Sequence, residues 1–120
     1  MSYDSENIFA KILRGEIPNN TVFENDFVLS FTDINPLCEI HVLVIPKKPY
    51  VNASDFIENA SNQDISGFWI GVTKTINSLD IKKSGYRLIA NTGRDGGQEV
   101  EHFHVHILAG ESVGPMVSKN

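Results

Sequence analysis

The segment 102–108, His-Phe-His-Val-His-Ile-Leu, limits the possible folds of this chain more than any other part of the sequence. Histidines and apolar residues alternate along it. Because successive side chains of a β-strand point to opposite faces, the alternation predicts a strand with one apolar core face and one face of three imidazoles. Neighbouring rings on such a face are about 6.6 Å apart, and the outer pair about 13 Å. Rings so spaced cannot all contact one reacting atom. The spacing therefore favours the central His104 for direct chemistry and its neighbours for orientation or proton transfer.

The fourth histidine, His41, lies in another β-rich run, 40–45. If this strand joins the first, all histidines of the chain gather at one place. The spacing alone leaves three interpretations open: a metal site, histidine catalysis near pH 7, and a plain polar face. No Cys-x-x-Cys motif, His-Glu-x-x-His motif or cluster of carboxylates supports a metal.

Length and composition restrict the class of protein. With 120 residues we expect a single domain, 1–120. The apolar content of 41% and the charged content of 21% are those of an ordinary globular protein. A net charge of −5 argues against nucleic acid as a partner, and the longest apolar runs, such as 42–45, are too short for a membrane span. The single cysteine, Cys38, cannot form an internal disulfide, which favours a cytoplasmic location.

Local patterns predict a short first helix. Asp4 or Ser5 can cap it, and its apolar residues, at positions 8, 9, 12 and 13, fall on one face. Gly15 and Pro18 end it.

A longer helix begins at Ser61, with Asp64 as its capping partner. Its apolar residues recur at helical spacing, which places Phe68 and Trp69 in the core. The remaining β-rich runs predict strands at 21–24, 27–33 and 86–90. Helix, strands, long helix and strands in this order predict an α+β fold with an antiparallel sheet.

A glycine-rich loop, 91–97, comes shortly before the histidine segment. It lets the backbone approach a ligand, although it lacks the Gly-Lys-Ser/Thr ending of a P-loop. Its position suggests a phosphate held by backbone N–H groups next to a nucleophile. Asn91 is either an amide contact for this phosphate or a turn residue, and Asp33 is either a ribose-binding carboxylate or a turn residue.

These residues resemble a known family. The segment 102–108 has the His-φ-His-φ-His-φ-φ form of the histidine triad (HIT) superfamily, where φ is apolar. Segments 7–18, 31–36 and 41–48 resemble the first helix and the next two strands of its Hint branch, the histidine triad nucleotide-binding proteins. Segments 96–100 and 114–116 resemble the bacterial members.

The resemblance implies a five-stranded antiparallel sheet with two helices, in a homodimer whose sheets join. It also implies hydrolysis of purine nucleoside 5′-phosphoramidates, such as AMP-amine or AMP-lysine, through a nucleotidyl-histidine intermediate. The implied partner is a purine nucleoside monophosphate or phosphoramidate ligand, and the implied chemistry needs no metal, so we expect neither a metal nor another cofactor.

The resemblance implies a role for each site residue. His104 matches the nucleophile, His102 the residue that orients it, and the pair His106 and His41 lies beside the leaving group and the phosphate. Asp33 matches the ribose-binding carboxylate. The segment that contacts the phosphate corresponds to Asn91, Gly97, Glu99 and Val100, with Glu99 contributing its backbone because its carboxylate repels a phosphate. The walls of the base pocket correspond to Ile8, Phe9, Ile12, Ile17, Phe31, Ile34 and Leu43.

Two alternative functions remain open. One is a nucleotide-binding regulatory or interaction module in which hydrolysis is incidental. The other is a sister HIT activity, the hydrolysis of dinucleoside polyphosphates, which the Hint-like first helix and the Gly-Pro-Met sequence at 114–116 disfavour.

Overall fold

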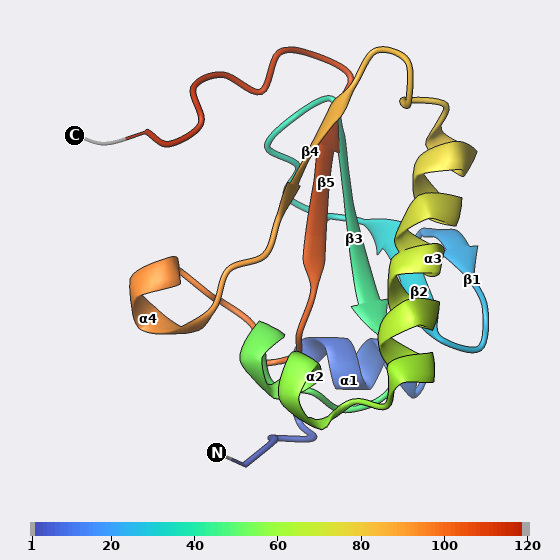
Figure 1. Ribbon diagram of the computed structural model, residues 1–120, viewed down its shortest axis with the longest axis vertical. Coiled ribbons are helices and arrows are strands. Elements are labelled where there is room, and N and C mark those ends of the chain that lie inside the picture. Colours follow the sequence, from blue (N-terminus) through green and yellow to red (C-terminus); the bar gives the residue numbers. More distant parts are fainter. Residues whose placement is uncertain (1, 119–120) are drawn as a thin grey trace.

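The computed structural model describes residues 2–118, so Met1, Lys119 and Asn120, the ends of the predicted domain, lie outside the described residues. A five-stranded antiparallel sheet forms its centre, as predicted, with the strand order β1-β2-β3-β5-β4 (Figure 1). The strand bounds are Thr21–Glu24 (β1), Val28–Thr32 (β2), Ile40–Pro46 (β3), Tyr86–Ile89 (β4) and Val105–Ala109 (β5).

Residues 2–118 contain four helices, whereas the resemblance predicts two. Their bounds are Ile8–Leu13 (α1), Ala53–Asn59 (α2), Asn62–Leu79 (α3) and Gly93–Gly96 (α4). The sequence pattern misses α2 and α4 because both are short: α2 buries Phe56 alone, and α4 is one turn inside the glycine-rich loop. None of the helices in this range has both the length and the apolar character needed to cross a membrane.

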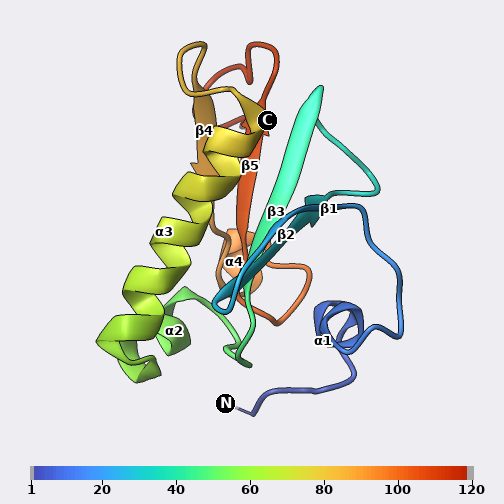
Figure 2. The same cartoon turned by 90° about the vertical axis from the view of Figure 1, so that its right-hand side faces the viewer.

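The long helix α3 packs on one side of the sheet, and α1 lies on the other side (Figure 2). The main core lies between α3 and the sheet, and its buried members include Phe68, Val72, Ile76, Phe103, Val105 and Ile107. The prediction that Trp69 belongs to the core is wrong, because 44% of this side chain is exposed. The reason is that α3 is covered on one side only, and Trp69 lies one residue, or about 100°, around the helix from the buried Phe68.

A second apolar cluster lies under α1. It consists of Phe9, Ile12, Leu29, Phe31, Leu43 and Ile45.

The cap of α1 is neither Asp4 nor Ser5 but Asn7, whose Oδ1 accepts a bond of 2.9 Å from the N–H of Ala10. Asp4 accepts instead from the N–H of Glu6, so its side chain stabilises the turn before the helix. The predicted cap of α3 at Ser61 is confirmed, since Oγ of Ser61 accepts from the N–H of Asp64, whereas the carboxylate of Asp64 accepts from Nζ of Lys48.

The histidine segment enters the sheet later than predicted, because β5 begins at Val105 and not at His102. The pairing of Val44 with Val105, continued along both strands, would place Pro46 opposite Phe103. Proline has no N–H to donate, so the ladder between β3 and β5 does not extend to this pair. The N–H of Phe103 donates instead to the carbonyl of Tyr50.

The alternation of faces nevertheless continues through residues 102–104. Phe103 lies in the core on the α3 side. On the other side, the Phe9 ring packs edge-on against both His102 and His104, with ring centroids 6.3 and 5.0 Å apart. All three histidines of the segment therefore share the α1 side of the sheet, as predicted.

Candidate active site

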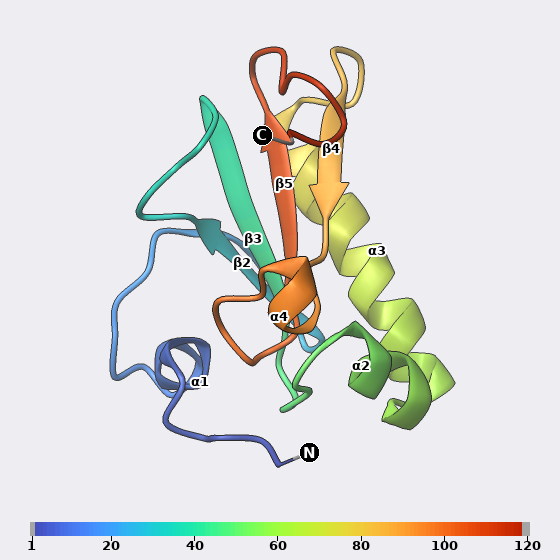
Figure 3. The same ribbon diagram turned by 90° about the vertical axis from the view of Figure 1, so that its left-hand side faces the viewer.

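A cavity of about 720 Å³ opens on the α1 side of the sheet, a volume typical of small-molecule sites. Figure 3 shows α1 and α4 gathered at the end of the sheet where β3 ends and β5 begins. All the site residues predicted from the sequence line this cavity, except His102: Ile8, Phe9, Ile12, Ile17, Phe31, Asp33, Ile34, His41, Leu43, Asn91, Gly97, Glu99, Val100, His104 and His106.

Several lining residues are not predicted from the sequence. They are Pro18, Asn19, Asn20, Thr32, Asn35 and Leu37. Each is next to, or within three positions of, a predicted residue in the chain, so local sequence proximity was the available signal. Most are polar or turn-forming residues of the loops before β1 and after β2, whose direction depends on tertiary packing.

His102 lies behind the cavity and is fully buried. Its Nε2 is 2.9 Å from the carbonyl oxygen of Pro46, which only accepts, so Nε2 carries the ring proton. Burial lowers the pKa of His102 to about 4, so the ring is neutral near pH 7. Nδ1 therefore has the lone pair and accepts from the hydroxyl of Tyr3 at 2.6 Å.

His104 is almost fully buried, and its Nδ1 donates to the backbone carbonyl of His102 at 2.7 Å. Its Nε2 is left with the lone pair. No hydrogen bond to this Nε2 is formed within the described residues. Since every buried side-chain nitrogen and oxygen of these residues has a partner, Nε2 is not buried and is the atom through which the ring reaches the cavity. Burial, as the largest effect, lowers the pKa of His104, which keeps this nitrogen unprotonated near pH 7.

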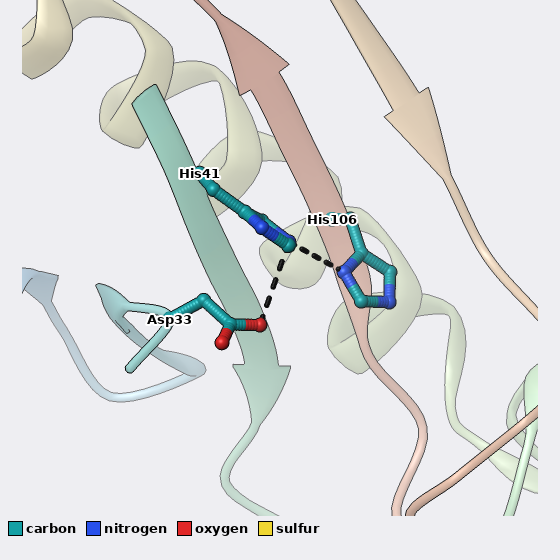
Figure 4. A group of neighbouring side chains, drawn as sticks. All are labelled: Asp33, His41 and His106. Atoms are coloured by element: carbon teal, nitrogen blue, oxygen red, sulfur yellow. Dashed lines mark hydrogen bonds and ion pairs between the residues drawn. The ribbon is translucent and has the colours of Figure 1, made fainter. Parts of the chain in front are cut away.

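His41 and His106 form a hydrogen-bonded pair beside Asp33 (Figure 4). The N–H of Leu37 donates to Nδ1 of His41 at 3.1 Å, so the proton of His41 is on Nε2. This Nε2 lies 2.9 Å from Nδ1 of His106 and 3.5 Å from Oδ2 of Asp33. Because His106 accepts at Nδ1, its own proton is on Nε2.

Burial lowers the pKa of both residues of this pair, that of His106 to about 4. The neighbouring carboxylate of Asp33 opposes this shift in each. Both rings are therefore neutral near pH 7. His106 presents an N–H donor in a site where His104 presents a lone pair.

Asp33 has two contacts that bear on the alternatives left open by the sequence. Its Oδ1 accepts from the N–H of Asn35 at 2.8 Å, as in a turn, and its Oδ2 faces His41. Asp33 is therefore a turn residue that also lines the cavity.

Asp33, His41 and His106 are also a possible metal-ligating group, since one ligand atom of each lies within 4.8 Å of the others. A metal bound at Nε2 of His41 requires the ring proton on Nδ1. The N–H of Leu37 already points at that nitrogen. Metal binding would therefore break this bond, so the backbone geometry favours the hydrogen-bonded pair.

The glycine-rich loop is held by Gln98, another residue that the sequence analysis missed. Its Oε1 accepts from the N–H of Gly93, and its Nε2 donates to the carbonyls of Val51 and Val100. The N–H groups of Gly97 and Gln98 are bonded within the α4 turn. Of the residues that follow this turn, Glu99 and Val100 line the cavity.

Comparison with known proteins identifies the family. A model of the HIT domain matches residues 14–113. The chain belongs to the HIT family. An uncharacterized HIT-like protein of Azospirillum brasilense is 44% identical to it over 118 residues, which are 98% of this chain and 97% of that protein. The purine nucleoside phosphoramidase of Escherichia coli K12 is 42% identical over 114 residues, or 94% of each chain.

Among solved structures, a histidine triad protein from Clostridium difficile is similar to this HIT family member, with a TM-score of 0.82 and 38% identity. The likeness covers 95% of this chain and 98% of that one. The resemblance to the HIT superfamily is confirmed.

Proposed function

We propose that this HIT family hydrolase cleaves the P–N bond of purine nucleoside 5′-phosphoramidates through a nucleotidyl-histidine intermediate. One observation carries the proposal: His104 is held by its Nδ1 proton, and its Nε2 lone pair is left for the cavity. A neutral imidazole in this state is a nucleophile near pH 7. The similarity to a protein named purine nucleoside phosphoramidase supports the same substrate class.

In the first step, Nε2 of His104 bonds to the α-phosphorus and the P–N bond breaks. The leaving nitrogen keeps the electron pair of that bond and takes the Nε2 proton of His106. Nε2 of His106 takes a replacement proton from a water in the cavity, which leaves hydroxide, while Nδ1 of His106 keeps accepting from Nε2 of His41 at 2.9 Å. A positioned acid of this kind contributes about 10²–10⁴-fold to a rate.

In the second step, the hydroxide so formed attacks the phosphorus, and the His106–His41 pair is already in its starting state. The bond between phosphorus and His104 breaks, and its electron pair returns to Nε2. The product is a nucleoside monophosphate. Two lower barriers replace one high barrier, and no metal takes part.

The cavity supports a nucleotide as the ligand. Phe9, Phe31 and Leu43 are buried apolar residues that line it and suit a purine ring. Asp33 supplies a carboxylate for ribose hydroxyls, and the backbone around Glu99 and Val100 serves the phosphate.

Replacement of the nucleophile tests the mechanism. We expect His104→Ala to lower kcat for AMP-amine hydrolysis by about 10³-fold or more, as removal of a nucleophile does elsewhere. Wild type should keep full activity in the presence of a chelator. The measurement is steady-state hydrolysis, with calorimetric AMP binding to His104→Ala as the control for an intact cavity.

Three outcomes contradict the proposal. Undiminished turnover in His104→Ala excludes this residue as the nucleophile. Tight AMP binding by a wild-type protein without turnover supports the binding-module alternative. Faster cleavage of dinucleoside polyphosphates than of AMP-amine assigns the site to the sister HIT activity.

A further inference from the structure

Tyr3 belongs to the segment before α1, far from the histidine segment in sequence. Figure 1 shows this segment at the end of the sheet where β3 ends and β5 begins. The phenol oxygen of Tyr3 is 2.6 Å from Nδ1 of His102, and the two rings meet edge-on with centroids 5.6 Å apart. Tyr3 does not line the cavity.

Tyr3 and Pro46 together hold both nitrogens of the buried His102 ring. The carbonyl of Pro46 accepts from Nε2, so Nδ1 has no proton and the Tyr3 hydroxyl donates to it. Without that hydroxyl, a fully buried acceptor would lose its partner. The contact therefore fixes the orientation and the tautomer of His102.

The backbone of His102 in turn orients His104. Its carbonyl accepts the Nδ1 proton of His104 at 2.7 Å, which leaves Nε2 with the lone pair. Residues 102–104 precede β5 and so lack the ladder of bonds that holds His106. In this segment, contacts to side chains and to loop carbonyls do the positioning that the sheet does farther along.

We propose that Tyr3 is a positioning residue for phosphoramidate hydrolysis: its hydroxyl holds His102, and His102 holds the nucleophile His104. The inference rests on the proposed function. It adds a residue outside the histidine triad, from the opposite end of the chain, to the machinery that orients the nucleophile. Tyr3 touches neither the substrate nor the reacting atoms.

The variant Tyr3→Phe tests this with the smallest possible change, since it removes one hydroxyl and keeps the ring. We expect kcat for AMP-amine hydrolysis to fall about tenfold, because a slight displacement of a reacting group is costly. KM should stay unchanged, since Tyr3 lies outside the cavity. Tyr86→Phe, the same change on the edge strand β4, should leave both constants unchanged.

A purely structural role would not split kcat from KM in this way. An unchanged kcat in Tyr3→Phe overturns the proposal. A rise of KM at unchanged kcat also overturns it, because that result would place Tyr3 in substrate binding.

A second measurement needs no substrate. Long-range proton–nitrogen NMR spectra show which ring nitrogen of each histidine carries the proton. In wild type we expect His102 protonated on Nε2 and His104 on Nδ1, and in Tyr3→Phe a shifted Nδ1 resonance of His102. A proton on Nδ1 of wild-type His102 overturns the proposal. Absence of phosphoramidate turnover in wild type would instead contradict the proposed function, and the spectra would still test the contact between Tyr3 and His102.

Discussion

The four imidazoles share an environment that lowers the pKa of each one. Burial is the largest cause at His41, His102, His104 and His106. Their protons are distributed by fixed partners, namely the N–H of Leu37 and the carbonyls of Pro46 and His102. The site therefore contains a free lone pair and a free N–H donor at the same pH, which the proposed hydrolysis requires.

His102 should make stability depend on pH. Its pKa is about 4 in the folded chain and near 6.5 when unfolded. Below pH 6.5 the unfolded state therefore binds a proton that the folded state does not yet bind. The free energy of unfolding falls as a result until the pH reaches about 4. At pH 5 the loss from His102 alone is about 2 kcal/mol.

His102→Asn removes this titration. We expect its free energy of unfolding to change less between pH 7 and pH 5 than that of wild type, whatever its value at pH 7. Urea denaturation at both pH values measures the difference. Equal changes in the two proteins would show that His102 titrates normally in the folded chain.

At the scale of elements, two glycines let α3 approach the sheet closely. A Cβ built on Gly71 would lie 2.5 Å from Cγ2 of Val28, which is fully buried in β2. A Cβ on Gly67 would clash with the ring of Phe27. The core between α3 and β2 has no room for even a methyl group at either position.

Gly71→Ala is therefore expected to destabilise the fold, although alanine is the better helix former. Overpacking costs about 1–3 kcal/mol, and helix propensity returns about 1 kcal/mol. The net change should lower the free energy of unfolding by about 1 kcal/mol. Ser66→Ala, on the exposed side of α3, should raise it slightly. Thermal or urea denaturation compares the two variants, and a Gly71→Ala protein as stable as Ser66→Ala would contradict the packing.

At the scale of the whole molecule, the sheet has edges at β1 and β4. β1 contributes Val22 and Phe23 to the core, whereas Tyr86 and Leu88 of β4 are 42% and 39% exposed. An open edge strand with apolar side chains is a template for pairing with a second chain. The homodimer implied by the resemblance stays a prediction, and β4 is the edge that we propose for it.

Leu88→Lys tests this edge by adding a like charge to β4 of each chain, which disfavours pairing of the two edges. We expect wild type to sediment with the mass of two chains and Leu88→Lys with the mass of one. Ile57→Lys, the same change at an exposed residue of α2, should leave the mass unchanged. Monomeric wild type, or dimeric Leu88→Lys, would remove β4 as the interface.

Much of the candidate site follows from local sequence. The alternation at 102–108 correctly predicts an apolar face toward α3 and a histidine face toward the cavity, because strand periodicity is a property of neighbouring residues. His41 joins these histidines because β3 pairs with β5. The cap of α3 at Ser61 is also predictable from the sequence, since a cap involves only the next few residues.

Other features depend on residues that only the folded chain brings together. Pro46 ends the ladder opposite Phe103, and the single-sided cover of α3 leaves Trp69 exposed. The N–H of Leu37 sets the proton of His41 through a loop whose path no local pattern predicts.

Sequence periodicity by itself determined which residue types share a face, and so which chemistry this protein can carry. The tertiary structure alone decided where each proton of that chemistry lies. Tyr3 and His102, 99 positions apart, make the difference clear: their hydrogen bond exists only after α1 and the strands have packed. A tautomer is set by the donor or acceptor in contact with each ring nitrogen, and those contacts are products of packing, not of spacing along the chain.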